Sequence, residues 1–343
     1  MNGMNDNPVI SVIIPMYNGA DHIERCLDLL DEQTYSGNYE VLIVDDCSTD
    51  ESVYYIKRYF KKLRKKDWFR MIECKENGRA GKARNIGVKE AKGEYVVFID
   101  QDDYPSVNFL ESLYRLTNNG KYDMASCDIM DRSGEEYHRC HIGEKKSLDD
   151  CDKRQLMKNF GYCFANLIRR DILNDNCIMF SENVLFEDCL YNYGVIPCLD
   201  SFNSTEEVLY FRVNDPGSQT AFFTRKKLYD RIESTLQYLE HFSQSKRIMR
   251  FQREIRSEAF YYVYLSCTLW LMAIPGLYDR ALFRFVLENG RKLNPGWNNA
   301  NLKGDRMMKR YMPFLRLVYS FPLMIHPLRF LGTSLYKIRK KLL

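Results

Sequence analysis

The sequence predicts an α/β protein with a doubly wound, mostly parallel sheet flanked by helices, followed by a helical C-terminal region. Short β-branched runs alternate with amphipathic segments in the first part of the chain. The runs lack polar alternation, as expected for strands buried on both faces of a parallel sheet. From about Phe222 the pattern changes to long helical stretches, and 343 residues exceed one average domain. We therefore expect a domain over residues 1–220 and a helical region over residues 221–343.

The individual elements follow from local patterns. Strands are predicted over residues 9–14, 41–44, 71–72 and 95–99, and helices over residues 23–30, 53–63 and 83–91. The first helix repeats its apolar residues at i, i+3, i+4 and i+7, which gives it one buried stripe. Ser48 and Glu51 have capping-box spacing before the second helix. In a sheet of this kind, ligands gather outside the carboxyl ends of the strands.

Composition limits the function and the compartment. The 50 Lys and Arg residues nearly balance 46 Asp and Glu residues, so a net charge of +4 gives no support for nucleic-acid binding. The 11 cysteines contain no CxxC pair and indicate reduced, buried thiols. Residues 1–8 lack the basic start and apolar run of a signal peptide. We expect a cytoplasmic protein.

An acidic cluster follows the strand predicted over residues 95–99. Asp100, Asp102 and Asp103 crowd together with Gln101 between them. Mg²⁺ and Mn²⁺ prefer oxygen ligands and share their coordination with substrate phosphates. The cluster therefore predicts a divalent metal and a diphosphate substrate; the alternative is a cap for the helix after Pro105.

Other charged residues could complete such a site. Asp45-Asp46 ends the second strand and could accept hydrogen bonds from a nucleoside, although the following residues also form an ordinary turn. Arg79, Lys82 and Arg84 supply positive charge between the acidic clusters, as phosphate binding requires. Glu187-Asp188 is a candidate general base, because burial and a like-charged neighbour raise a carboxyl pKa. A surface position is the alternative for this pair.

The C-terminal region carries features of membrane contact. Residues 259–278 contain no charge, but their polar side chains and Pro275-Gly276 favour a packed or interfacial helix over a spanning one. Residues 311–336 mix apolar and aromatic side chains with arginine, and a basic cluster follows over residues 337–341. Such segments suit anionic membrane surfaces. We expect peripheral contact at the inner face of the cell membrane; an amphipathic helix packed on the protein is the alternative.

Six blocks in order resemble the family 2 inverting glycosyltransferases with a GT-A fold. The matching blocks are SVIIPMYN over residues 11–18, VDDCSTD over 44–50, ARNIG over 83–87, GEY over 93–95, FIDQDD over 98–103 and FED over 186–188. Residues 210–214 and 218–220 also resemble the segment that follows the base in many members. The resemblance covers about residues 8–220. It implies transfer of a hexosyl or N-acetylhexosaminyl group from a nucleotide diphosphate sugar, with UDP-sugars favoured, to a glycan or lipid-linked hydroxyl in surface polysaccharide synthesis.

The resemblance implies a nucleoside pocket at the ends of the first two strands. Carried over by position, Pro15, Tyr17 and Asp46 would hold the nucleoside, with Tyr17 near the base and Asp46 bonding it. Arg84 would lie near the same pocket.

The resemblance also implies the groups that perform the reaction. Asp102 and Asp103 would meet the ribose, the Mn²⁺ or Mg²⁺ and the diphosphate, with Asp103 the more direct metal ligand. Asp188 would take the proton from the acceptor hydroxyl, and Glu187 beside it would contact the substrate. A single displacement would invert the anomeric configuration.

Two departures and two competing functions complete the prediction. Cys47 replaces the usual glycine of the family, and no QxxRW signature of processive synthases is present, which favours transfer of a single sugar. A nucleotidyltransferase would need a glycine-rich loop after the first strand, where Pro15-Met16 stands instead. A non-catalytic glycan-binding or assembly protein on the same fold is disfavoured by the intact carboxylates.

Overall fold

The computed structural model describes residues 8–131, 134, 136–137, 141–159, 161–213, 224–295, 297 and 306–328. Contacts divide the chain into two compact units, Met1–Ser218 and Gln219–Leu343. The basic cluster over residues 337–341, residues 218–220 and the N-terminal residues 1–7 lie outside the described residues.

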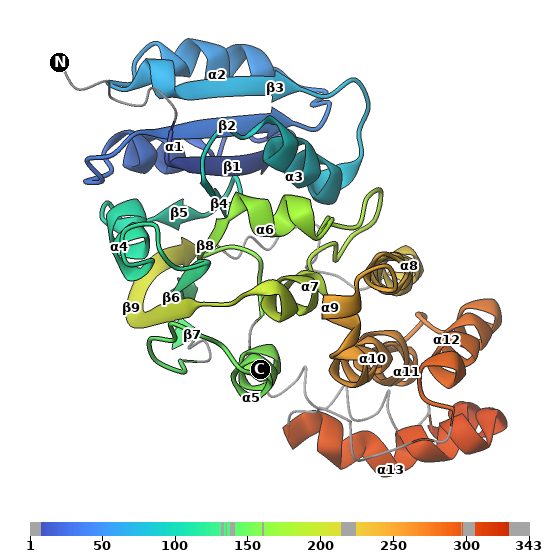
Figure 1. Cartoon of the computed structure of the whole chain (residues 1–343). Coiled ribbons are helices and arrows are strands. Elements are labelled where there is room, and N and C mark those ends of the chain that lie inside the picture. Colours follow the sequence, from blue (N-terminus) through green and yellow to red (C-terminus); the bar gives the residue numbers. More distant parts are fainter. Residues whose placement is uncertain are drawn as a thin grey trace. The chain divides into compact units, whose positions relative to one another are not determined.

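Nine described strands form one sheet in the first unit (Figure 1). They are β1 (Ile10–Met16), β2 (Tyr39–Asp45), β3 (Phe69–Glu73), β4 (Tyr95–Phe98), β5 (Tyr104–Pro105), β6 (Met124–Asp131), β7 (Glu136–Tyr137), β8 (Asn166–Arg169) and β9 (Phe202–Arg212). Their order is β3-β2-β1-β4-β8-β6-β9-β5, with β7 on β6. The first four strands are parallel, and β1 and β2 are completely buried, as their unbroken β-branched runs predict.

Beyond β4 the sheet is mixed. The pairs β4–β8, β6–β8, β6–β7 and β5–β9 are antiparallel, whereas β6–β9 is parallel. The parallel pattern therefore describes only the first half of the sheet. Asn166–Arg169 is too short to stand out in the sequence and is buried against neighbours on both sides.

Helices connect and cover the strands of the first unit. They are α1 (Glu24–Asp31), α2 (Ser52–Phe60), the short η1 (Lys66–Trp68), α3 (Arg79–Glu90), α4 (Phe109–Leu116), α5 (Asp150–Asn159), α6 (Arg170–Asp175) and α7 (Tyr191–Cys198). Helix α3 packs on β1 and β2 at Gly87, where an added Cβ would lie 2.3 Å from Ile13 Cγ2. Helix α4 packs on β6, β8 and β9.

The predicted capping box before α2 does not form. The N-cap is Glu51, with no side-chain cap hydrogen bond, and Ser48 Oγ instead accepts a hydrogen bond from the Asn18 amide at 2.9 Å. The β1–α1 loop lies beside Ser48, and its Asn18 amide uses the Ser48 hydroxyl as an acceptor. Ser48 therefore connects two loops and does not cap α2.

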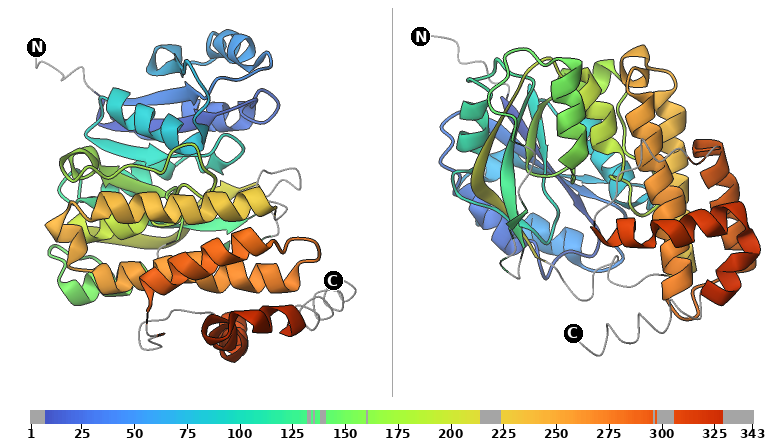
Figure 2. Two further views of the ribbon diagram at one scale, coloured as in Figure 1. Left: turned by 90° about the vertical axis from the view of Figure 1, so that its right-hand side faces the viewer. Right: turned by 90° about the horizontal axis from the view of Figure 1, so that it is seen from below.

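The described part of the second unit is helical (Figure 2). It contains α8 (Arg225–Phe242), α9 (Lys246–Met249), α10 (Gln252–Phe260), the π-helix η2 (Tyr261–Ser266), α11 (Cys267–Ala273), α12 (Arg280–Leu293), α13 (Arg306–Ser320) and η4 (Pro322–Met324). The uncharged segment over residues 259–278 forms the end of α10, η2 and α11, which end before Pro275 and are largely buried. Among the described residues, no helix is long and apolar enough to cross a membrane.

An aromatic cluster holds the second unit together. The rings of Phe260, Tyr264, Trp297 and Tyr319 contact one another edge to face or stacked, with centroids 5.2 to 6.1 Å apart. The buried Tyr264 hydroxyl donates to the Leu315 carbonyl at 2.9 Å and so ties η2 to α13. A hydrogen-bond partner of this kind offsets the cost of burying a tyrosine hydroxyl.

Candidate active site

The predicted site residues meet at the carboxyl ends of parallel strands. Met16 pairs with Asp45 at the ends of β1 and β2, so Tyr17 and Asp46 leave the sheet side by side. Strand β4 lies on the other side of β1 and leads into Asp100. Neighbouring parallel strands end together, which explains why motifs far apart in the sequence converge here.

Gln101 fixes the loop that follows β1. Its side-chain carbonyl accepts a hydrogen bond from the Tyr17 amide at 2.9 Å, and its amide group donates to the Tyr17 carbonyl at 3.3 Å. Gly19 leaves the necessary room, because an added Cβ would lie 2.5 Å from Gln101 Oε1. The acidic motif therefore positions half-buried Tyr17 through a residue that the sequence analysis treated as a spacer.

Asp46 lies buried beneath the start of α3. Its Oδ1 accepts a hydrogen bond from the Gly78 amide at 2.7 Å, and its backbone carbonyl accepts one from Asn77 Nδ2 at 2.8 Å. Burial raises the pKa of Asp46 above its usual value, against the lowering effect of hydrogen bonds from Gly78 and Arg79. One oxygen of Asp46 thus holds the turn between β3 and α3.

Cys47 adopts a backbone conformation that favours glycine, the residue usual at this position in the resembling family. Its φ is 64°, in the left-handed region, where a side chain costs about 1 kcal/mol or more. Cysteine at this position therefore introduces backbone strain. The following loop is held by Thr49, whose amide donates to Asn18 Oδ1 at 2.9 Å.

Arg84 bridges two carboxylates that lie far apart in the sequence. The guanidinium is buried, donates to Asp100 Oδ1 at 2.6 Å and forms a second charge-assisted hydrogen bond with Glu187 Oε1. The Phe180 ring lies beside it, 5.3 Å from the guanidinium carbon. This Arg84 ion triad joins the acidic motif after β4 to the segment that carries the candidate base. Lys82, one of the two other cations expected here besides Arg79, instead pairs with Glu76.

A second set of contacts fixes the segment before Asp188. Asn85 Oδ1 accepts from the Phe180 amide at 2.8 Å, and Asn85 Nδ2 donates to the Phe180 carbonyl at 3.0 Å. An added Cβ on Gly81 would lie 2.0 Å from the Ser181 carbonyl oxygen, so the backbones approach closely. Asn85 belongs to the ARNIG block over residues 83–87, and nothing in its local pattern indicates this role.

An aromatic stack supports the same segment. The buried Phe180 ring stacks on Tyr191 with centroids 4.1 Å apart, and Phe98 at the end of β4 meets it edge to face at 5.1 Å. Aromatic rings of Phe180, Tyr191 and Phe98 therefore support the chain on both sides of the Glu187-Asp188 pair, up to the start of α7.

Asp188 has the properties of a general base. Its side chain keeps partial access to solvent, yet surrounding protein atoms desolvate the charged form. Desolvation and then the Glu187 charge raise the pKa of Asp188 to about 6, while Arg84 acts in the lowering direction. A carboxylate with this pKa is mostly ionised at neutral pH and accepts a proton better than an ordinary aspartate.

The two carboxylates after Gln101 lie in different surroundings. Asp103 is buried: its Oδ2 accepts from the Tyr210 hydroxyl and its Oδ1 from the Val213 amide, both at 2.8 Å. Burial, Asp100 and Asp102 raise the pKa of Asp103 to about 8. Asp102 is partly exposed, and desolvation followed by the charge of Asp100 raises its pKa as well.

These carboxylates fit a divalent cation shared with a diphosphate. Within the described residues, no three His, Cys, Asp or Glu side chains are arranged to hold a metal on their own. Mg²⁺ and Mn²⁺ at nucleotide sites commonly take one or two carboxylates and complete their coordination with phosphate oxygens and water. Asp102 offers an oxygen-donor group with partial solvent access, and Asp100 beside it adds negative charge that a cation would neutralise.

Comparisons with known proteins agree with this geometry. The profile described as Glycosyl transferase family 2 matches residues 11–176. The glycosyltransferase EpsJ of Bacillus subtilis is 28% identical over 222 residues, 62% of this chain and 63% of EpsJ. The poly(ribitol-phosphate) β-N-acetylglucosaminyltransferase TarS of Staphylococcus aureus is 41% identical over 95 residues, 27% of this chain and 16% of TarS. The chain thus matches less than two thirds of the length of these relatives.

Solved structures show the same fold. TarS residues 1–349 in complex with UDP-GlcNAc superimpose with a TM-score of 0.71 at 19% identity, covering 96% of this chain and 91% of that one. The mannosyltransferase PcManGT of Pyrobaculum calidifontis, in complex with GDP-Man and Mn²⁺, gives a TM-score of 0.50 at 18% identity, covering 97% and 86%. The sheet and the C-terminal helical region share the GT-A fold of TarS, and residues 11–176 form a glycosyl transferase family 2 domain.

Proposed function

We propose that the chain transfers a hexosyl or N-acetylhexosaminyl group from a UDP-sugar to a hydroxyl of a glycan or lipid-linked acceptor, in surface polysaccharide synthesis. The observation that carries the proposal is the Arg84 ion triad, which joins Asp100 of the acidic motif to Glu187 beside Asp188. One buried cation thus holds the candidate diphosphate-binding motif close to the segment of the candidate base. This arrangement suits a displacement at an anomeric carbon. The UDP-GlcNAc complex of TarS and the GDP-Man complex of PcManGT support a nucleotide-sugar donor.

The nucleoside would bind against the loops after β1 and β2. Pro15 and the half-buried Tyr17 would border this space, and Gln101 holds the backbone of Tyr17. Asp46, which accepts from the Gly78 amide, would direct its second oxygen to the nucleoside. Arg84 would act on this pocket through Asp100.

Asp188 would act as the base. Its carboxylate would accept the proton of the acceptor hydroxyl while that oxygen attacks the anomeric carbon from the face opposite the diphosphate. The anomeric bond to the diphosphate breaks as the new glycosidic bond forms, which inverts the configuration. Glu187, paired with Arg84, would contact the substrate and keep negative charge near Asp188, which raises the proton affinity of the base.

Asp102 would provide the first protein ligand for Mn²⁺ or Mg²⁺, with Asp103 in support. Asp103 already accepts two hydrogen bonds, so Asp102 is the more accessible carboxylate. The metal, when bound, supplies positive charge against the leaving diphosphate. The Mn²⁺ in the PcManGT complex supports the use of a divalent metal.

Calorimetry with a panel of nucleoside diphosphates tests the donor site. We expect micromolar binding of UDP in Mn²⁺, lost in EDTA and weakened at least tenfold by Asp102→Ala. Transfer of radiolabelled sugar from the matching donor should disappear in Asp188→Asn, which should still bind UDP. A protein that binds no nucleotide with any metal would refute the proposal.

We also propose peripheral contact with the cytoplasmic face of the cell membrane. The large apolar side chains Phe314, Phe321 and Leu323 are exposed near the end of α13 and in η4, and Arg316 beside them is exposed and basic. Aromatic and basic side chains together suit an anionic interface. Co-sedimentation with phosphatidylglycerol vesicles should fall in the double variant Phe321→Asp, Leu323→Asp. Equal pelleting of both proteins would remove this proposal.

A further inference from the structure

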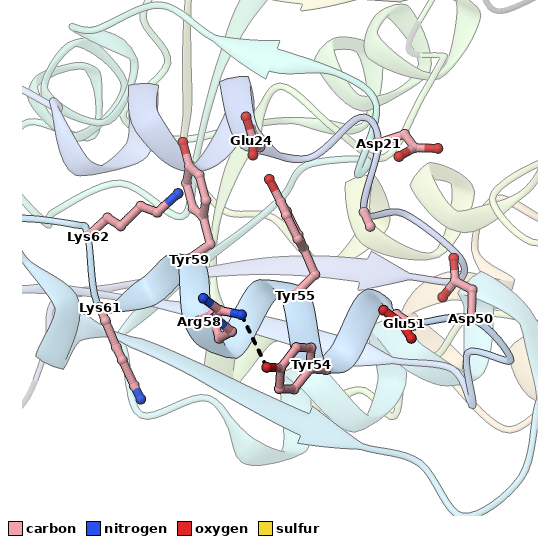
Figure 3. A pocket seen from close by; sticks show the side chains of 11 residues that line it. Asp21, Glu24, Asp50, Glu51, Tyr54, Tyr55, Arg58, Tyr59, Lys61 and Lys62 are labelled. Atoms are coloured by element: carbon pink, nitrogen blue, oxygen red, sulfur yellow. Dashed lines mark hydrogen bonds between the residues drawn. The ribbon is translucent and has the colours of Figure 1, made fainter.

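A groove of about 1060 Å³ separates α1 from α2 (Figure 3). Side chains of both helices and of the loops that lead into them line it. The groove contains none of the residues that we place around the donor sugar and the base. It is therefore a surface separate from the proposed donor site.

Tyrosines form the middle of the groove. Tyr54 and Tyr55 expose 62% and 36% of their surface. Tyr55 stacks on Tyr59 with ring centroids 6.2 Å apart and an interplanar angle of 24°. The buried Tyr59 is fixed by its hydroxyl, which donates to Asp28 Oδ1 at 2.8 Å. The groove therefore presents aromatic faces on a rigid support, the kind of surface that stacks on the C–H face of a pyranose ring.

Charges of opposite sign occupy the two ends (Figure 3). Asp21, Asp50 and Glu51 lie at the end next to the loops, and their carboxylates can accept hydrogen bonds from pairs of sugar hydroxyls. Lys61 and Lys62 lie at the other end, where cations would attract phosphate or carboxylate groups. A ligand with hydroxyls, apolar ring faces and spaced negative charges complements all three features.

The groove is continuous with the loops of the donor site. The Asn18 and Thr49 contacts already described join the β1–α1 loop to the β2–α2 loop. The Ala20 amide donates to Ser52 Oγ at 3.1 Å and extends this connection to the start of α2. The acidic end of the groove is therefore built by the same loops that carry Tyr17 and Asp46.

We propose that this groove binds a segment of an anionic glycan chain, at a distance from the hydroxyl that receives the sugar. The inference rests on the proposed function, because a transferase acting on a polymer gains affinity and effective concentration from a second attachment point. The tyrosines stack on sugar rings, the carboxylates at the loop end accept from hydroxyls, and the lysines hold the negative groups. Polymeric acceptors are retained between turnovers, and short acceptors are not.

The test uses the full-length chain on a printed array of anionic and neutral bacterial polysaccharides. We expect binding to at least one anionic polysaccharide and to none of the neutral ones, with affinity falling as NaCl is raised. The double variant Tyr54→Ala, Tyr55→Ala should bind at least about tenfold more weakly, from the loss of two ring contacts. Lys61→Glu, Lys62→Glu should bind at least as weakly, without the loss of any aromatic face. Tyr229→Ala, which removes an exposed tyrosine of α8, serves as the matched control and should bind like the wild type.

UDP calorimetry on the same variants separates this inference from the proposed function. Loss of UDP binding in the wild type would refute the donor site, whereas normal UDP binding with no polysaccharide binding would refute the groove alone. Equal polysaccharide binding by the tyrosine variant and Tyr229→Ala would also overturn the inference. Light scattering measures the oligomeric state as a last test. A dimer that both groove variants abolish would assign the surface to a second copy of the chain and overturn the glycan assignment.

Discussion

Replacement of Arg84 by methionine tests the organisation of the site most directly. Methionine keeps the length of the aliphatic stem and removes the guanidinium that joins Asp100 to Glu187. The Arg84 side chain is only 4% exposed, so the substitution leaves Glu187, which is 13% exposed, without its cation in a poorly hydrated position.

The expected loss of stability follows from this burial. Removal of one partner of a buried ion pair costs about 3–5 kcal/mol, because the remaining charge is uncompensated. Asp100 is 31% exposed and regains part of its hydration, which places the loss near the low end, at about 3 kcal/mol. Arg64→Met is the matched control: Arg64 also pairs with a carboxylate, Asp31 at 3.4 Å, but its side chain is 69% exposed, so we expect about 1 kcal/mol or less.

Urea unfolding of both variants measures these differences. A second measurement, the pH dependence of kcat/KM, reports on the base itself. Since Arg84 acts to lower the pKa of Asp188, the limb of the profile assigned to Asp188 should move to higher pH in Arg84→Met. If Arg84→Met loses no more stability than Arg64→Met and the limb stays in place, the ion triad has neither role and the reasoning fails.

Three further predictions follow from the same site. Wild-type kcat/KM should fall about tenfold per pH unit below the Asp188 pKa of about 6, because the protonated carboxyl cannot accept a proton. Asp188→Asn should lower kcat by about 10²-fold or more and remove this limb, and a wild-type profile without this limb would contradict the assignment. Asp102→Asn should weaken Mn²⁺-dependent UDP binding more than Asp103→Asn does. Asp103→Asn should cost more stability, because Asp103 accepts hydrogen bonds from Tyr210 and Val213. If calorimetry shows that Asp103→Asn weakens UDP binding more, Asp103 is the direct metal ligand. Cys47→Gly should raise the free energy of unfolding by about 0.5 kcal/mol, because glycine relieves the strain at a φ of 64° but gains conformational freedom in the unfolded chain. A variant that urea unfolds more easily than the wild type would show that the thiol makes a compensating contact.

The first half of the fold was predictable because its signals are local. The unbroken apolar runs give β1, β2 and β4 their burial on both faces. Strands β1 and β2 end one or two residues later than predicted, and β4 ends one residue earlier. Ser48 shows the limit of such reasoning. Its spacing to Glu51 fits a capping box, but α2 begins only at Ser52 with Glu51 at its N-cap, and the Ser48 hydroxyl accepts from the Asn18 amide of the neighbouring loop. The local sequence does not show which of these two roles Ser48 takes.

The local sequence is enough to predict that the acidic motifs collect at one edge of a sheet. Each motif directly follows a buried strand, and parallel strands of a doubly wound sheet end together, so the position of Asp46 or Asp100 requires no knowledge of its partners. The surroundings of each carboxylate depend on packing between distant segments. Arg84 reaches Glu187 across 103 positions, and Tyr210 reaches Asp103 across 107. These pairings determine charge, burial and pKa, and they depend on which long loops close onto the sheet. Chain periodicity reports the face that a residue occupies, whereas the identity of a distant partner is settled only when the strands and loops pack.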